Sequence, residues 1–527
     1  MTGPDGQGFS QPTDRLLSRM LSWDWIACVV LAASLIFRFA FYDNARFAGD
    51  EALQYSIAKS VGDLKHFPVQ GTLTTVAVGA HIPGGVYFWI LGLPLLVFNS
   101  PEASMALIVL LSVGGLAIGY RLLRREYGPP AALGGLLLAA FNPFHLFHSD
   151  RIWNPNLLLP IGFWFLVVLV YTIRGQGRRS TFWLGALMVA APQIHLSVAL
   201  LVALAVAAMV VVRPKGFRWL QFVAGLAAGA ATYLPYVIVD ALNGFANTRL
   251  LLGNVAGSSA PVIESLRAVY YMVLYAAGDM TYFVAKGSAF PMTEWGFLRG
   301  SNLKIMSDFL ELHLPTGIML TGAIAIGVLL SLGATLALVG NTIVNLARKG
   351  RDAVVQNPLA FLVVVNLPLV AALFWGRKLF FPHYTIVVFP LALVPVAWVL
   401  SRVRSVRIQG AVLVLLALVA FAQGVLSARY YLQEEAKTSV PVFREVARAI
   451  LADSPGQAVA FECNLPRTQC SSYPAHVIAD RELGQDFPED GAARRRYMMT
   501  LPGEEYAKGA TRVWDLGPIW LVRRDRR

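Results

Sequence analysis

Charged residues are scarce in this chain. Only 14% of its 527 residues are Asp, Glu, Lys or Arg, whereas soluble globular domains contain about 25%. Hydrophobic residues make up 56%, and apolar runs of about 17 to 25 residues, the length that crosses a bilayer core, recur along most of the sequence. This composition excludes a soluble globular protein and predicts an all-α polytopic membrane protein.

Three further features are missing. Residues 1–20 are polar, and no small-residue cleavage site follows the first apolar run, so we expect a cytoplasmic tail over 1–22 rather than a cleaved signal. No internal repeat is visible, although transporters often contain one. No motif has the spacing of a metal site.

Cysteine is rare, with three in the whole chain. Cys28 falls within the first apolar run and is explained by packing. Cys463 and Cys470 lie near the C-terminus, where an oxidising compartment would permit a disulfide between them.

Basic residues set the orientation, because Lys and Arg concentrate in short cytoplasmic loops. Such residues precede the first apolar run (Arg15, Arg19) and cluster at 121–125, 174–179, 213–218, 348–351 and 402–407. Placing these regions in the cytoplasm predicts spans near 24–41, 104–121, 131–149, 157–173, 219–239, 315–340, 357–375, 384–401 and 408–427.

Two segments need separate treatment. The run 181–212 has basic residues at both ends, so we expect two short helices that reverse at "PQIHLS" (192–197), which brings the count to about eleven. The run "GGVYFWILGLPLLVF" (84–98) is short for a span, and both of its ends are expected outside. We interpret it as a juxtamembrane or re-entrant helix; the alternative is a short true span.

The scheme leaves loops 42–103 and 240–314 and the tail 429–527 on the outer face. The tail carries 15 basic and 14 acidic residues, so +12 of the net charge of +13 belongs to the membrane part. That charge is a topology signal that suits an anionic lipid bilayer, and it does not indicate nucleic acid. A helical opening (440–451) and two strand-like pieces in the tail, "QAVAFECN" (457–464) and "GPIWLVRR" (517–524), predict a small α/β domain.

Two adjacent acids follow the first span. Asp50 and Glu51 lie in "FAGDEALQYSIAKS" (47–60), at the start of a predicted helix. Asp50 is placed to cap that helix. The alternative is a general base at the lipid–water boundary, where carboxyl pKa values rise and a carboxylate can take a proton from a hydroxyl.

Two polar groups are expected on the same face. In "HSDRIWNPN" (148–156), Arg151 has the chemistry of a phosphate clamp, with Trp153 and Asn154 as sugar or lipid contacts; an ordinary polar span end is the alternative. In "WGRKLFFPHY" (375–384), Arg377 and Lys378 contradict the positive-inside rule and suit a phosphate-linked lipid. Weaker candidates for substrate contacts are Tyr55, His81, His195 and His383.

These motifs, in this order, resemble a known family. The acids are followed by "HIPGGVYFW" (81–89), "RLLRREYG" (121–128), "SDRIWNP" (149–155), "PQIHLSVALL" (192–201) and "RKLFFPHYTIVVFPL" (377–391). Over roughly 20–430 the chain looks like the GT-C glycosyltransferases of the protein-O-mannosyltransferase and aminoarabinose-transferase-like superfamily. It departs from their first-loop pattern at Gly84-Gly85, which permits a close backbone approach.

The resemblance implies a GT-C transmembrane domain over 23–428 in the bacterial inner membrane, with a periplasmic active site and a soluble domain over 429–527. It also implies an inverting transfer of sugar from a polyprenyl-phosphate carrier to a periplasmic acceptor hydroxyl. Asp50 would be the base with Glu51 beside it, Arg151 and Arg377 or Lys378 would bind phosphate, and His81 would occupy the motif's His position. Some relatives use a divalent metal and others none. The alternative function is a transporter or flippase of a lipid-linked sugar.

Overall fold

The computed structural model describes residues 23–74, 79–253, 269, 272–273, 314–373, 382–433, 435–465, 471–491, 493–503 and 510–525. Arg377, Lys378 and Cys470 lie outside these residues, as does most of the predicted loop 240–314. Predictions that rest on them therefore stay predictions.

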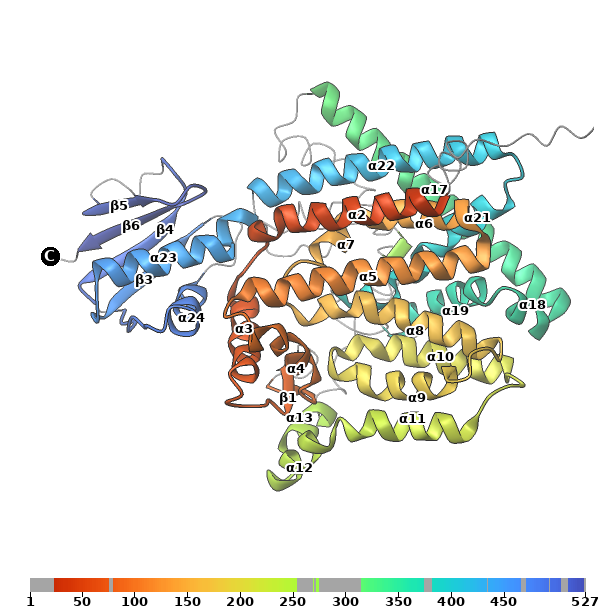
Figure 1. Ribbon diagram of the computed structural model, residues 1–527, viewed down its shortest axis with the longest axis horizontal. Helices are drawn as coiled ribbons and strands as arrows, with labels where there is room; N and C mark the ends of the chain where they lie inside the picture. The colour runs from red at the N-terminus through yellow and green to blue at the C-terminus, as the bar shows by residue number, and fades with distance from the viewer. Residues whose placement is uncertain are drawn as a thin grey trace, which may run out of the picture.

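Apolar helices form the body of the molecule (Figure 1). They are α2 (Trp23–Phe41), α5 (Pro101–Tyr127), α6 (Pro129–Ala140), α8 (Leu158–Ile173), α9 (Ser180–Ala190), α10 (Ala199–Val212), α11 (Trp219–Ala231), α12 (Leu234–Leu242), α17 (Leu314–Lys349), α19 (Pro358–Leu373), α21 (Val394–Arg402) and α22 (Val406–Gln433). Shorter connecting helices are α7 (Pro143–Phe147), α13 (Ala246–Gly253), α18 (Arg351–Gln356) and α20 (Phe389–Ala392). Apart from α12 and α13, the described parts of these helices join or pack against one hydrophobic core rich in Leu, Val, Phe and Ala side chains.

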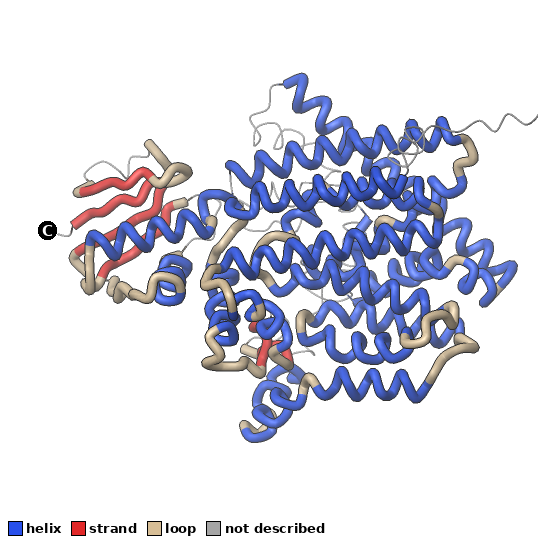
Figure 2. The backbone as a smooth tube through the Cα atoms, in the orientation of Figure 1, coloured by secondary structure: helices blue, strands red, loops and turns tan. Residues whose placement is uncertain are grey.

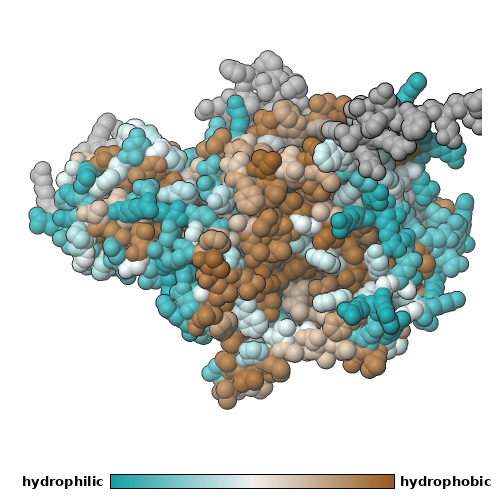
Figure 3. Space-filling model, viewed as in Figure 1, coloured by the Kyte–Doolittle hydropathy of each residue, from teal (hydrophilic) through white to brown (hydrophobic). Residues whose placement is uncertain are grey.

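A helix or helix pair lies at every predicted span. Within the part of the chain that the structure describes, six helices are long and apolar enough to cross a membrane, and a seventh crossing results if the pair α11–α12, bent by 51°, is one span. The run 181–212 reverses as predicted, with α9 and α10 joined through two short 3₁₀ turns around His195. Hydrophobic side chains cover the middle of these helices in Figure 3, as expected for a surface in contact with lipid.

Small residues allow two of these helices to lie very close together. A Cβ added at Gly225 on α11 would collide with the backbone oxygen of Phe182 on α9, and one at Gly185 would collide with that of Phe222. Backbone approach through Gly is a common way to pack helices in membranes, where hydrophobic burial does not drive association.

The two acids lie at one end of the bundle, in a small subdomain built from the first long loop. It contains α3 (Gly49–Gly62), α4 (Val86–Gly92) and an antiparallel hairpin of β1 (Gln70–Leu73) and β2 (His81–Pro83). The helical part of the run 84–98 is α4 followed by a 3₁₀ turn at Pro94–Leu96, and α4 packs on α3. Seven residues are too few to cross a bilayer. The alternative of a short true span is therefore wrong.

The C-terminal unit is a small α/β fold, as predicted. Helices α23 (Val440–Asp453) and α24 (Tyr473–Arg481) cover a sheet of β3 (Val459–Asn464), β4 (Arg495–Thr500), β5 (Arg512–Asp515) and β6 (Trp520–Asp525). The strand order is β3-β4-β6-β5, with β3 and β4 parallel and the other pairs antiparallel (Figure 2).

This unit is docked on the acid-bearing subdomain. One continuous hydrophobic cluster contains Phe47 and Tyr55 from the first loop together with Phe443 and Ile478 from α23 and α24. Arg444 adds an ion-pair bridge, since it lies 2.7 Å from Glu102 at the start of α5 and 2.5 Å from Glu482 after α24. The C-terminal unit is thus fixed beside the segment that carries Asp50.

Candidate active site

The acids stand at the first turn of α3, behind a fixed backbone. The amide of Phe47 donates to the carbonyl of Thr438 at 2.7 Å, and Arg46 and Ser439 form an isolated antiparallel bridge. The chain that leads from α22 into the C-terminal unit therefore holds the strand-like segment just before the acids.

The N-terminus of α3 is capped by the side chain of Glu51, not by that of Asp50. Helix α3 begins at Gly49, with Ala48 as its N-cap residue, and the Glu51 carboxylate accepts a hydrogen bond from the Ala48 amide at 3.1 Å. The prediction that Asp50 is the cap is wrong. Glu51 is the third residue of the helix, from which a side chain reaches back to the N-cap amide.

Glu51 is also buried against Arg151. Their closest atoms, Oε1 and Nη1, are 3.5 Å apart, and the two side chains are only 4% and 3% exposed. The guanidinium carbon lies 3.4 Å from the ring centre of Phe147 and 4.9 Å from that of Trp153. The fold thus brings together two motifs that are a hundred residues apart. A buried pair of this kind fixes the position of both side chains.

Asp50 is the exposed member of the acid pair. Desolvation by the surrounding protein raises the pKa of its carboxyl, and the neighbouring Glu51 charge raises it further, whereas Arg46 and Arg151 act in the opposite direction. A carboxylate with a raised pKa is a stronger base, and Asp50 is the acid of the pair whose side chain is exposed to accept a proton.

Aromatic and imidazole rings cluster next to Arg151. Trp153 stacks on His148, with ring centres 5.6 Å apart, and meets His383 at 4.7 Å. His195 lies 5.9 Å from His383 and 5.6 Å from Tyr384. Three predicted substrate contacts, namely Trp153, His195 and His383, therefore come from separate motifs to one place.

Three other predicted residues have different surroundings. Asn154 is buried and donates to the carbonyl of Ile194 at 3.1 Å, so it ties the 148–156 segment to the α9–α10 turn. Tyr55 is fully buried beside Phe47 in the shared hydrophobic cluster, and this burial argues against a substrate contact. His81 lies on β2 and lines a separate pocket that Ser56 and Arg481 also line.

A buried polar group next to the site was not predicted from the sequence. Arg38, 1% exposed near the end of α2, donates to Ser149 Oγ at 2.8 Å, lies 2.6 Å from His145 Nδ1, and interacts electrostatically with Asp150. Asp150 is itself 2% exposed and precedes Arg151. The available signal was an arginine inside the first apolar run, because ionisable residues within spans are rare and usually functional.

Among the described residues, no group of three His, Cys, Asp or Glu side chains is arranged to hold a metal ion. Cys28 is a free thiol on the exposed surface of α2, so packing inside the protein does not explain it. The pairing of Cys463 with Cys470 stays a prediction.

Comparison with solved structures decides the fold. ArnT from Cupriavidus metallidurans, solved with undecaprenyl phosphate, superposes with a TM-score of 0.56 at 13% identity, covering 95% of this chain and 98% of that one. The chain has the GT-C fold. The same enzyme without ligand gives a TM-score of 0.47 at 15% identity over the same shares of both chains. An oligosaccharyltransferase from Archaeoglobus fulgidus, AglB, gives 0.38 at 14% identity, covering 82% of this chain and 58% of that one.

No family model matches the sequence, and no curated protein matches it significantly. At 13% identity the likeness to ArnT establishes the GT-C fold and leaves the chemistry to be argued from the site.

Proposed function

We propose that the protein is a membrane glycosyltransferase that moves a sugar from a polyprenyl-phosphate carrier to an acceptor hydroxyl with inversion, on the periplasmic face of the bacterial inner membrane. The observation that carries the proposal is the division of roles at the start of α3. Glu51 is buried in an ion pair with Arg151, whereas the adjacent Asp50 is exposed and has a raised pKa. The ArnT structure, which contains undecaprenyl phosphate on the same fold, supports this class of donor.

The proposed step is a single displacement. The acceptor oxygen forms a bond to the anomeric carbon, its proton passes to the Asp50 carboxylate, and the bond from that carbon to the carrier phosphate breaks with its electron pair on the phosphate oxygen. General-base catalysis of this kind contributes about 10²- to 10⁴-fold. No acid is needed for the leaving group, because the departing phosphate is already a stable anion.

Cations are required where the negative charge grows. Arg151 lies beside the acids, and its Nε has no hydrogen-bond partner among the described residues. We assign Arg151 to the phosphate side of the site, together with Arg377 and Lys378. Fixed positive charges aimed at a developing anion lower the barrier without reorganisation. Trp153, His195 and His383 would form the wall against the sugar or the lipid.

The proposal is tested by incubating the purified protein in lipid with a panel of polyprenyl-phosphate sugars and periplasmic glycan or lipid acceptors. Transfer is measured as released carrier together with a glycosylated product. An active wild type that moves the intact lipid-linked sugar across the bilayer, without cleaving it, would instead establish a flippase.

A further inference from the structure

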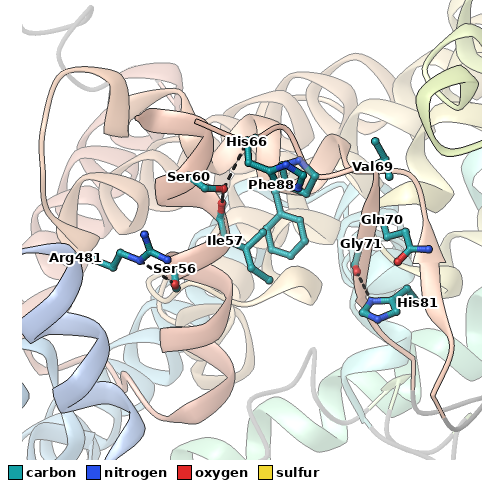
Figure 4. A pocket seen from close by; sticks show the side chains of 11 residues that line it. Ser56, Ile57, Ser60, His66, Val69, Gln70, Gly71, His81, Phe88 and Arg481 are labelled. Atoms are coloured by element: carbon teal, nitrogen blue, oxygen red, sulfur yellow. Dashed lines mark hydrogen bonds between the residues drawn. The ribbon is translucent and has the colours of Figure 1, made fainter. Parts of the chain in front are cut away.

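A pocket of about 430 Å³ lies between the acid-bearing subdomain and the C-terminal unit (Figure 4). Ser56 and Ser60 of α3 form one wall, the segment from His66 to Gly71 and His81 of β2 form another, and Arg481 of α24 closes it. We call this the α3–α24 pocket. It contains none of the residues assigned above to catalysis or to phosphate binding.

Hydrogen bonds hold the walls of this pocket in place. Trp89 Nε1 donates to the carbonyl of Pro68 at 2.9 Å, and the His81 ring nitrogen Nδ1 lies 3.0 Å from the carbonyl of Gly71. Asn247 of α13 bonds to both the amide and the carbonyl of His81, at 2.7 and 3.0 Å. Preformed walls of this kind reduce the entropic cost of binding.

Gly84 and Gly85 allow the walls of the α3–α24 pocket to come close together. A Cβ at Gly85 would overlap the carbonyl of Pro68, and Gly84 adopts a φ of +94° against the side chain of Gln193. The predicted close backbone approach at Gly84-Gly85 is confirmed. It brings the His66–Gly71 wall against the start of α4.

The lining has the chemistry of a sugar-binding site. Serine hydroxyls, imidazoles and the Gln70 amide offer hydrogen bonds, and Phe88 and Ile57 provide an apolar wall. Among the described residues that line the pocket, Arg481 is the one Lys or Arg, and none is Asp or Glu. Its Nε donates to Ser56 Oγ at 3.2 Å and lies 3.1 Å from Oδ2 of Asp480, a side chain that is 58% exposed (Figure 4). A guanidinium so placed favours a carboxylate or phosphate group.

The pocket lies along α3 from the proposed base. Ile57 follows Asp50 by seven residues, which is close to two helical turns, so both residues are on the same side of α3 and about 10 Å apart along its axis. Leu53, 42% exposed, lies between them. A molecule seated in the pocket therefore has a path along one helix face to Asp50.

We propose that the α3–α24 pocket binds the acceptor through a sugar residue that carries an anionic group, a carboxylate or a phosphate. The acceptor role rests on the proposed function, whereas the binding of an anionic sugar does not depend on it. The C-terminal unit would then complete the acceptor site through Arg481.

Binding is tested first, on the full-length protein, by saturation-transfer NMR with three probes: glucuronate, glucose 6-phosphate and glucose. We expect at least one anionic sugar to bind in preference to glucose, and Arg481→Gln to weaken that binding about tenfold or more, with partial recovery in Arg481→Lys. Arg448→Gln, on the exposed face of α23, is the matched control. Preference for glucuronate identifies a carboxylate ligand, and preference for glucose 6-phosphate a phosphate. Equal binding of glucose, no binding of any probe, or binding unchanged in Arg481→Gln overturns the inference.

The acceptor role is tested second, in the transfer assay. Arg481→Gln should raise the KM for the acceptor and leave the KM for the donor and the acceptor-independent release of carrier unchanged. An acceptor KM that does not move overturns the acceptor role. If the protein binds an anionic sugar through Arg481 but transfers no sugar, the proposed function is wrong and the anionic-sugar site still stands.

Discussion

Asp50 and Glu51 are neighbours with different surroundings, and the difference predicts a pH dependence. Glu51 raises the pKa of Asp50, while Arg151 lowers it. In Glu51→Gln the repelling charge is gone and Arg151 is no longer neutralised, so both changes lower the pKa of Asp50. We expect the acid limb of the pH profile of kcat/KM to lie above the ordinary carboxyl range, about 3.9, and to move to lower pH in Glu51→Gln. A limb that stays in place or moves upward contradicts the assignment.

Because Glu51 and Arg151 form a buried pair, we expect substitutions of the two residues to have non-additive effects on the free energy of unfolding. Removing one partner leaves an unpaired buried charge, which costs about 3–5 kcal/mol. We expect Glu51→Gln and Arg151→Gln each to lower Tm markedly, and the double variant to lower it by less than the sum. Arg496→Gln, which breaks a pair of 31% and 47% exposed side chains, is the control and should change stability by less than about 1 kcal/mol. Strictly additive losses would show that the two charges do not interact.

At the scale of the elements, Arg444 joins three helical segments. It pairs with Glu102 at the start of α5 and Glu482 after α24, and its side chain is 18% exposed. Arg444→Gln should loosen the C-terminal unit, because hydrogen bonds to charged groups contribute about 1.5–3 kcal/mol each. Faster proteolysis between α22 and α23, relative to the wild type and to Arg448→Gln, is the expected result. Unchanged cleavage would mean that the hydrophobic cluster alone holds the unit.

Helix packing gives a second prediction at this scale. Gly225→Ala places a methyl group against the backbone of α9 and should lower stability by about 1–3 kcal/mol. Gly114→Ala on α5 meets nothing within 4 Å and should be neutral or stabilising by up to about 1 kcal/mol. Thermal unfolding of the two variants in the same detergent separates them. Equal Tm values would show that α9 and α11 tolerate separation.

At the scale of the whole molecule, local signals predicted the helices and their order well. The 181–212 reversal, the short helix within 84–98, and the helix and two strands of the C-terminal unit could all be read from hydropathy, charge and flanking residues. The elements β4, β5 and α24 were missed, since short segments on a mixed surface carry weak periodicity.

The site was harder to predict because it is a product of long-range packing. The motifs supplied Asp50, Glu51 and Arg151 as candidates, but the ion pair, the capping by Glu51 and the burial of Tyr55 depend on how α3 meets the 148–153 segment. In the sequence, Arg38 was visible only as an arginine inside the first apolar run, and Asp150 only as an acid just beyond a predicted span. The α3–α24 pocket joins residues 425 positions apart, a separation that no local pattern reports.

The most direct test of the account is single-turnover transfer by Asp50→Asn. In the wild type, the raised pKa of Asp50 means that its ionised form is disfavoured in the folded protein. The free energy of unfolding therefore falls as pH rises through this pKa. Because Asn carries no charge, we expect the Asp50→Asn variant to unfold at or above the wild-type Tm at neutral pH. The control is Asp43→Asn, because Asp43 is a nearby exposed acid to which no catalytic role is assigned. We expect Asp50→Asn to lose about 10²- to 10⁴-fold in the rate of product formation, with Asp43→Asn unchanged. A folded Asp50→Asn protein that transfers sugar at the wild-type rate would contradict the central claim.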